Sequence, residues 1–292
     1  MTLHLSHRLR ARAAGAALAC LLAAGAAPGI VLAGPSAAPE CDERGDSLLH
    51  PAPAACLAPI DTDRPHLTDS PHTIAPGAVQ VETELLTLAT SPSGDLGVGA
   101  GLGLGTVLAR VGVVRGVDFD VGYQAGTLSR GPGGWSYRAG PTVLVRTKLA
   151  LFDVGPVATT LAPILLIPTH KRDAVQGGAS VLVGAELPAE LDLEVNVVAT
   201  TEAHEDGGHR WVFVPTAALT RNLVGPLSAF VESYHELRYS GPHRHTWLAN
   251  GGLLLRLGRF VQLDAGVRCG VTSGTTPVTA FLGLSFLAPG AW

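Results

Sequence analysis

Beyond residue 33 the sequence has no long apolar run and no sustained helical period, so neither a transmembrane helix nor a helical bundle is expected there. It has no excess of basic residues either: the formal net charge is −4, and a nucleic-acid partner is therefore not expected. No nucleophile-elbow sequence is present, and Cys269 stands alone without a histidine and an acid beside it, which argues against a hydrolase. What the chain does have is a basic, then apolar N-terminus and a recurring alternation of apolar and polar residues.

The N-terminus has the order of a secretory signal peptide. Arg8, Arg10 and Arg12 precede any acid, residues 13–33 carry no charge, and residues 31–33 (VLA) form a cleavage tripeptide. A retained membrane anchor is the alternative, because 21 uncharged residues could just span a bilayer. The alanine- and glycine-rich composition and the missing stop-transfer pattern favour the signal peptide.

Cys41 and Cys56 lie close together in residues 34–59, a stretch rich in proline and alanine that has the composition of a linker. In an exported protein they would meet an oxidising compartment. A local disulfide between them is one prediction, and two free thiols are the other.

The clearest alternation runs over residues 191–197, where leucine and valine take one face of a strand and Asp192, Glu194 and Asn196 take the other. Residues 260–271 alternate in the same way. Runs of about ten residues, the length that a tilted strand needs to cross a bilayer, recur along the chain. Because a soluble sandwich also alternates, this pattern alone does not decide whether water or lipid surrounds the strands.

The lengths of the connections discriminate between these alternatives. The predicted strands are residues 79–89, 102–114, 117–127, 136–151, 156–168, 177–187, 191–203, 211–222, 227–239, 245–257, 260–271 and 277–287. Short and long connections alternate between them, as in a barrel with tight periplasmic turns and longer outer loops, and unlike the Greek-key crossovers of an immunoglobulin-like sandwich. The predicted fold class is all-β: an antiparallel meander transmembrane β-barrel of about twelve strands in the bacterial outer membrane, with both termini in the periplasm.

Prolines test this assignment, because proline cannot donate to a hydrogen-bond ladder. Pro141, Pro163 and Pro215 fall inside predicted strands. They predict bulges or local strand ends at these positions.

Aromatic residues fall at the outer ends of predicted strands, as in the interfacial girdle of a membrane barrel. They are Trp135, Trp211, Trp247 and Tyr239. The girdle is sparse, since aromatic residues make up only 5% of the chain.

A run of polar and turn residues directly precedes and enters the first predicted strand. Its members are Asp61, Thr62, Asp63, Arg64, Pro65, Thr68, Ser70, Pro71, Thr73, Pro76, Gly77, Gln80 and Glu82. Over residues 61–84 it resembles the opening of the outer-membrane family named for the MetA pathway of phenol degradation, whose members are labelled transporters. The resemblance implies an outer-membrane β-barrel that passes small, often aromatic or apolar, molecules, and it supplies no catalytic residue. The C-terminus departs from the usual terminal aromatic strand, which leaves open whether Phe286 or Trp292 is read by the outer-membrane assembly machinery.

Candidate chemistry elsewhere is weak. Residues 97–105 are rich in glycine but lack the third glycine and the following helix of a dinucleotide site. His204, Glu205, Asp206 and His209, with Glu202 before them and His243 and His245 in the next loop, are interpreted as solvated loop faces rather than a metal site. Because side chains alternate between the two faces of a strand, His235 falls on the opposite face from Glu232 and Glu236. Neither a metal, nor a cofactor, nor an enzymatic activity is predicted, and a barrel enzyme is the third hypothesis.

Charged residues that parity turns toward the barrel interior are the candidate lumen residues. They are Glu82, Glu84, Asp192, Glu194, Glu232, Glu236, Arg238, Asp264 and Arg268. The leading hypothesis is passage of an unidentified small, apolar or aromatic solute through the bilayer. The second is a structural or surface-interaction barrel whose inward charges pair across a plugged lumen. The chain divides into a signal peptide (1–33), a periplasmic linker with a candidate plug or gate near residues 61–76 (34–76) and the barrel (77–292).

Overall fold

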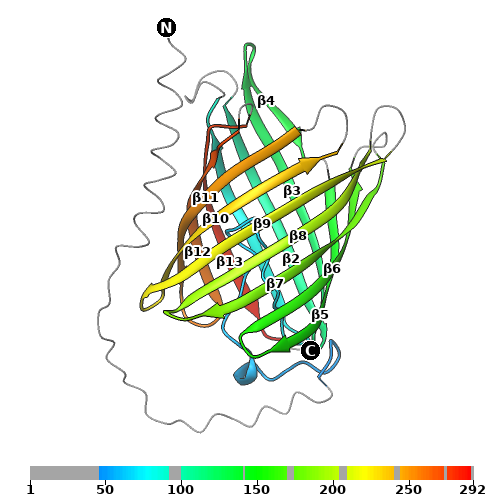
Figure 1. Ribbon diagram of the computed structural model, residues 1–292, viewed down its shortest axis with the longest axis vertical. Helices are drawn as coiled ribbons and strands as arrows, with labels where there is room; N and C mark the ends of the chain where they lie inside the picture. Colours follow the sequence, from blue (N-terminus) through cyan, green and yellow to red (C-terminus); the bar gives the residue numbers. More distant parts are fainter. Residues whose placement is uncertain are drawn as a thin grey trace.

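A computed structural model describes residues 46–91, 100–140, 142–169, 174–203, 209–239, 244–272 and 275–290 (Figure 1). The predicted signal peptide, Cys41, Trp292 and the loop residues 204–206 and His243 lie outside the described residues. In this part of the chain no helix is long and apolar enough to cross a membrane.

The described residues form thirteen strands and one short 3₁₀ turn. They are η1 (Ala54–Cys56), β1 (Val79–Ala89), β2 (Gly101–Val114), β3 (Val117–Gly131), β4 (Gly134–Ala139), β5 (Thr142–Val154), β6 (Val157–Pro168), β7 (Gln176–Leu187), β8 (Leu191–Ala203), β9 (His209–Val224), β10 (Leu227–Arg238), β11 (Arg244–Arg256), β12 (Val261–Gly270) and β13 (Val278–Ala288).

The strands close into a barrel (Figure 1). Apart from β4 and β5, which do not pair with each other, strands adjacent in sequence pair antiparallel, and β1 pairs with both β2 and β13, which closes the ring. β4 and β5 both pair with β3, along different parts of its length. Together they therefore occupy one strand position of the barrel, and the chain between them is interrupted at Gly140. The predicted twelve-strand antiparallel meander is therefore confirmed, and β8 matches its predicted range residue for residue.

Between the predicted strands 117–127 and 136–151, residues 128–135 were expected to form one of the longer outer loops, and this prediction is wrong. β3 continues to Gly131, the chain turns at residues 132–133, and β4 returns with Trp135 opposite Arg130. The turn signal of Pro132-Gly133 occupies only two residues, and Gly134 takes a positive φ of 104° that glycine tolerates. This hairpin extends beyond the rest of the barrel in Figure 1, so Trp135 lies near its tip rather than on the rim.

The three prolines have different effects. β4 ends at Ala139 and β5 begins at Thr142, on either side of residue 141, where a bulge or a local strand end was predicted. β6 and β9 instead run on through Pro163 and Pro215 without a shift of register. Around each, one ladder skips pairs: β5–β6 passes from Arg146↔Ile164 to Leu149↔Leu161, and β9–β10 from Tyr234↔Thr216 to Leu237↔Phe213. Losing pairing on one side accommodates the missing N–H without a bulge.

The two faces of the wall reverse the distribution found in soluble proteins. Inward positions include buried charged side chains such as Arg110, Lys148 and Asp120, while outward positions expose large apolar side chains such as Val181, Val197 and Leu253. Trp211, Trp247 and Tyr239 are exposed at the end of the barrel with the longer connections, the long-loop end. A polar interior inside an apolar outer surface is the pattern of a barrel whose outer solvent is lipid.

Residues 57–76, the lumen segment, lie inside the barrel. Ile60 N–H donates to Arg259 O (2.7 Å) and Gly77 N–H to Gly112 O (2.9 Å), both beside short turns. The segment therefore enters and leaves at the opposite end of the barrel, the short-turn end. At its deepest point it reaches Glu232, midway along β10.

Candidate functional site

The strongest contacts of the lumen segment join Asp63 to a cationic part of the wall. Asp63 lies 2.5 Å from Arg146 Nη2, 2.6 Å from Lys148 Nζ and 3.6 Å from Arg110 Nη1. These three cations come from β2 and β5, and burial leaves Arg110 and Lys148 with no exposed surface. Burial alone would raise the pKa of the Asp63 carboxyl, but Arg110, Lys148 and Arg146 hold it well below its usual range.

Further acids complete this cluster, so the cations are not left in excess. Asp120 bonds Arg146 Nε at 2.7 Å, Asp118 bonds Arg110 Nη2 at 2.8 Å, and Glu82 lies 3.3 Å from Arg110 Nη1. From the segment itself, Asp69 bonds Arg146 Nη1 at 2.7 Å. Such pairs are strongly destabilising to break, because the remaining partner becomes a buried, uncompensated charge.

Arg64, next to Asp63, contacts an acidic part of the barrel wall. Its guanidinium donates to Asp264 Oδ1 (2.8 Å) and to Glu84 Oε2 (3.1 Å), from β12 and β1. Arg268 also donates to Glu84 (2.8 Å) and stacks over Phe281 at 4.5 Å. Two successive residues of the segment, Asp63 and Arg64, thus have opposite charges, and each pairs with side chains of the opposite sign on a different side of the lumen.

The tip of the segment is held by Glu232. Its Oε1 accepts from Leu67 N–H (2.8 Å), Thr68 N–H (2.6 Å) and Thr68 Oγ1 (2.6 Å), and its Oε2 accepts from Asn250 (2.8 Å). A carboxylate that accepts several N–H groups is a strong anchor.

His66 lies beside this tip, with its ring edge-on to Phe230 (centroids 4.8 Å apart) and its Nε2 3.3 Å from Thr220 Oγ1. Burial lowers the pKa of the imidazole below its usual range, although Glu232 opposes this. His66 Nδ1 faces Glu194 Oε2 at 3.4 Å, and neither atom has a hydrogen-bond partner among the described residues.

Three inward glycines of the wall leave room for the segment. A Cβ added to Gly112 would lie 2.0 Å from Ala75 O, one on Gly184 would lie 2.6 Å from Pro71 Cγ, and one on Gly283 would lie 2.4 Å from Arg64 Nη2. Real side chains essentially never approach this closely. The wall is therefore shaped to the segment as well as charged to match it.

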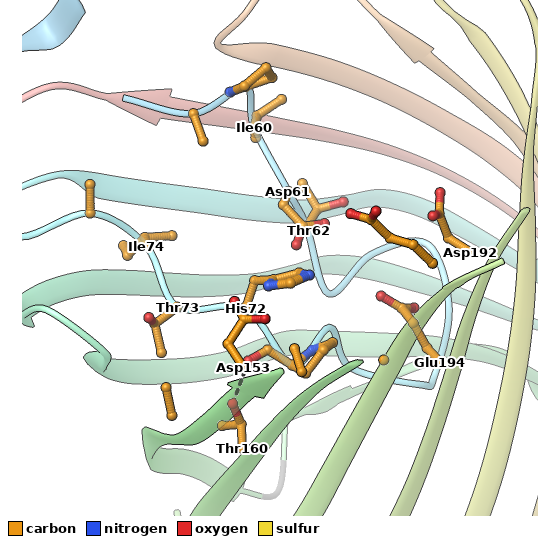
Figure 2. A pocket seen from close by; sticks show the side chains of 18 of the residues that line it. Ile60, Asp61, Thr62, His72, Thr73, Ile74, Asp153, Thr160, Asp192 and Glu194 are labelled. Atoms are coloured by element: carbon orange, nitrogen blue, oxygen red, sulfur yellow. Dashed lines mark hydrogen bonds between the residues drawn. The ribbon is translucent and has the colours of Figure 1, made fainter. Parts of the chain in front are cut away.

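On its remaining side the segment borders a cavity of about 860 Å³ (Figure 2). The cavity reaches the short-turn end, where Gly116, Gly155 and Pro156 line it. Figure 2 shows Asp61 and His72 of the segment on one side and Asp192 and Glu194 of β8 on the other. Thr160 Oγ1 bonds Pro71 O (2.5 Å) at its edge.

The predicted lumen residues fall into three groups. Those that contact the segment are Glu82, Glu84, Glu194, Glu232 and Asp264. Arg268 reaches it only through Glu84, and Asp192 lines the cavity. Glu236 and Arg238 lie nearer the long-loop end, where they pair with each other (2.7 Å) and Arg238 lies 3.5 Å from Glu202.

The residues of the quoted motif gather in the lumen segment and at the start of β1. Asp63, Arg64, Thr68, Ser70 and Pro71 contact the wall or one another, and the Arg64–Pro65 peptide bond is cis. Gln80 Nε2 bonds Asp61 O (2.7 Å), Glu82 Oε2 accepts from Arg64 N–H (3.0 Å), and Gly77 has a φ of 75° with Pro51 against it.

The sequence prediction missed five residues of the main charged cluster. They are Arg110, Asp118, Asp120, Arg146 and Lys148. The sequence contained a signal for four of them. Asp118 and Asp120 flank Phe119, and Arg146 and Lys148 flank Thr147, so within their predicted strands each pair lies on one face, which could have been assigned to the lumen.

Other candidate chemistry is accounted for differently. The described residues hold no group of three or more His, Cys, Asp or Glu arranged to bind a metal. His235 lies on the outer face, with Nε2 3.0 Å from Ser233 Oγ and Nδ1 2.9 Å from His245 Nε2. The indole N–H of Trp247 also donates to Ser233 Oγ (3.1 Å). Cys56 is disulfide-bonded, and its predicted partner Cys41 lies outside the described residues, so that pairing stays a prediction.

Comparison with solved structures gives the fold class. The NanC porin matches with a TM-score of 0.52 at 7% identity, covering 71% of this chain and 98% of the porin. An anion-selective porin from Comamonas acidovorans matches with a TM-score of 0.41 at 8% identity, covering 72% and 98%. No family model and no curated protein sequence matches the chain. The fold is that of the outer-membrane β-barrels, and the resemblance to the phenol-degradation family stays a prediction.

Proposed function

We propose that this protein is an outer-membrane pore or transporter for small solutes, whose passage is closed by its own lumen segment acting as a plug or gate. Both termini would lie in the periplasm, at the short-turn end, and lipid would cover the apolar outer face. The partners are the bilayer, the outer-membrane assembly machinery and a small solute.

The observation that carries this proposal is the way in which the segment is held. Among the described residues, the contacts that bind it to the wall are mainly hydrogen bonds and ion pairs between inward side chains and a short, non-helical chain. Breaking these ion pairs is costly, but the wall behind them lines a polar lumen, so water that enters as the segment moves would offset part of the cost. The inward glycines, which leave room for the segment against the wall, support this proposal.

The resemblance implies an apolar or aromatic solute. The cavity beside the segment has both apolar lining, from Phe152, Ala158 and Leu254, and charged lining, from Asp192 and Glu194. A solute with an aromatic body and a polar group fits this lining better than a pure hydrocarbon does.

A structural barrel is the second candidate, and the density of ion pairs around Asp63 favours it. Conductance of the refolded protein in a planar bilayer separates the two. A pore closed by its segment gives small or rare steps that grow when the anchors of the segment are removed. A structural barrel stays silent in both forms while still migrating as a folded, heat-modifiable band.

A further inference from the structure

The cavity beside the lumen segment is acidic. Its lining includes six acidic residues, against two arginines and two histidines. The acids are Asp46, Asp61, Asp153, Glu186, Asp192 and Glu194. A concave, low-dielectric space lined by one sign of charge concentrates the opposite charge.

Three of these acids are not neutralised by the protein. Among the described residues, Asp61, Glu186 and Asp192 form no ion pair within 4 Å, whereas every acid around Asp63 does so or bonds a cation directly. Arg256 also lines the cavity and attracts Asp192 only at longer range. Negative charge on the cavity side of the lumen is thus left without a counter-ion, whereas the acids on the other side are paired with cations.

The register of the wall places like charges together. Glu186 of β7 is directly opposite Asp192 of β8, and Glu194 is opposite Gly184 one inward step further along. Opposed like charges destabilise a strand pair unless a counter-charge offsets them. Asp61 approaches the same space from the lumen segment (Figure 2).

A second observation points to a ligand that donates hydrogen bonds. Glu194 Oε2 and His66 Nδ1 are buried and lie 3.4 Å apart, and among the described residues neither atom has a hydrogen-bond partner; the His66 side chain is only 5% exposed. Both residues line the cavity. Buried polar atoms are normally satisfied, so an unsatisfied carboxylate oxygen here indicates a place for a donor.

The rest of the lining limits the shape of that donor. Phe152, Ala158, Leu254 and Ile60 provide apolar surface in the same cavity. A bare inorganic cation would leave this surface in contact with water. A molecule with an apolar body and a protonated amine would cover it and bring N–H donors to the carboxylates.

We propose that this cavity is a binding site for small organic cations, an amine on an apolar body, with Glu194, Asp192 and Asp61 as the carboxylates that recognise the ammonium group. That such cations are also the transported solute rests on the proposed function. The binding site itself does not require the barrel to conduct.

Isothermal titration calorimetry on the refolded full-length protein in detergent, at 150 mM NaCl to screen diffuse attraction, tests the site. Three probes share one body and differ in charge: 2-phenylethylamine, 2-phenylethanol and phenylacetate. The amine is expected to bind about tenfold or more tightly than the alcohol, and phenylacetate most weakly, because a charge-assisted hydrogen bond is worth roughly this factor.

Two variants locate the site. Glu194→Gln and Asp192→Asn are each expected to weaken amine binding about tenfold and to leave the alcohol unchanged. Glu190→Gln is the matched control, because Glu190 is exposed at the β7–β8 turn and does not line the cavity. Asp192 is exposed, so its variant folds even if Glu194→Gln does not.

Equal affinity for amine and alcohol, no binding of the amine at millimolar concentration, or amine affinity insensitive to both variants would overturn the site. Conductance decides the proposed function separately. A barrel that binds the amine through Glu194 and Asp192 but never conducts keeps the site and loses the passage. A barrel that conducts without preferring the amine loses the site and keeps the passage.

Discussion

The lumen segment has two unlike sides. Toward β2, β3 and β5 it meets buried cations that Asp63 and Asp69 neutralise. Toward β6–β9 it borders a cavity in which three acids, Asp61, Glu186 and Asp192, form no ion pair among the described residues. The difference indicates that one side holds the segment in place while the other leaves room beside it. We therefore expect the proposed passage to widen most easily on the cavity side.

The largest effect is expected from Asp63→Ala, which leaves Arg110, Arg146 and Lys148 with fewer acids in a buried cluster. Removing one partner of a buried ion pair costs about 3–5 kcal/mol. The free energy of unfolding, from urea titration of the refolded barrel, should fall by this amount. Lys148→Met added to Asp63→Ala should recover part of the loss, and a change below about 1 kcal/mol would show that the paired side does not hold the segment.

Gly112→Ala tests the fit of shape rather than of charge. The new Cβ would lie 2.0 Å from Ala75 O, a backbone atom that cannot rotate away. Overpacking of this kind costs about 1–3 kcal/mol and should displace the end of the segment, which limited proteolysis of the segment would report. Gly133→Ala is the control, because nothing lies within 4 Å of its added Cβ. Equal protection of the segment in both variants would mean that the wall is not shaped to it.

Glu232→Gln probes the tip of the segment. The amide oxygen can still accept from Leu67 and Thr68, but the charge that strengthens these bonds is lost, so we expect about 1 kcal/mol of destabilisation. Hydrogen exchange of the Leu67 and Thr68 amides should accelerate about fivefold, while exchange in β10 stays unchanged. Unaltered exchange at both amides would place the anchor elsewhere.

Asp192→Asn applies the same acid-to-amide change on the cavity side and should have the smallest effect. Asp192 is exposed and forms no ion pair among the described residues, so its neutralisation should change the free energy of unfolding by less than about 0.5 kcal/mol. A loss comparable to that of Asp63→Ala, in the same urea titration, would remove the distinction between the two sides.

The barrel itself was predictable because its signals are local. Alternation in residues 191–197 fixes which side chains face inward, and the connection lengths fix the meander. Pro163 and Pro215 misled the prediction, because the sequence does not show that a strand can lose pairing toward one neighbour and stay continuous. Residues 128–135 misled it because a glycine-rich stretch can form a tight hairpin as well as a loop.

The docking of the segment was not predictable, because its contacts join distant residues. Asp63 and Arg146 are 83 positions apart, and Arg64 and Asp264 are 200 apart. The alternation of inward and outward residues could place Arg146 and Asp264 in the lumen. It could not show that Asp63 pairs with Arg146 and Arg64 with Asp264, because these contacts depend on how the closed barrel arranges its strands around the segment. The cavity depends likewise on where the segment stops.

The central claim is that the barrel is a passage closed by its own segment. Single-channel conductance of the wild-type protein and of the double variant Asp63→Ala, Arg64→Ala, which removes both anchors, tests it most directly. We predict small or rare steps for the wild type and frequent, larger steps for the variant, with both proteins migrating as folded, heat-modifiable barrels. Equal conductance, or silence from both folded proteins, would contradict the claim.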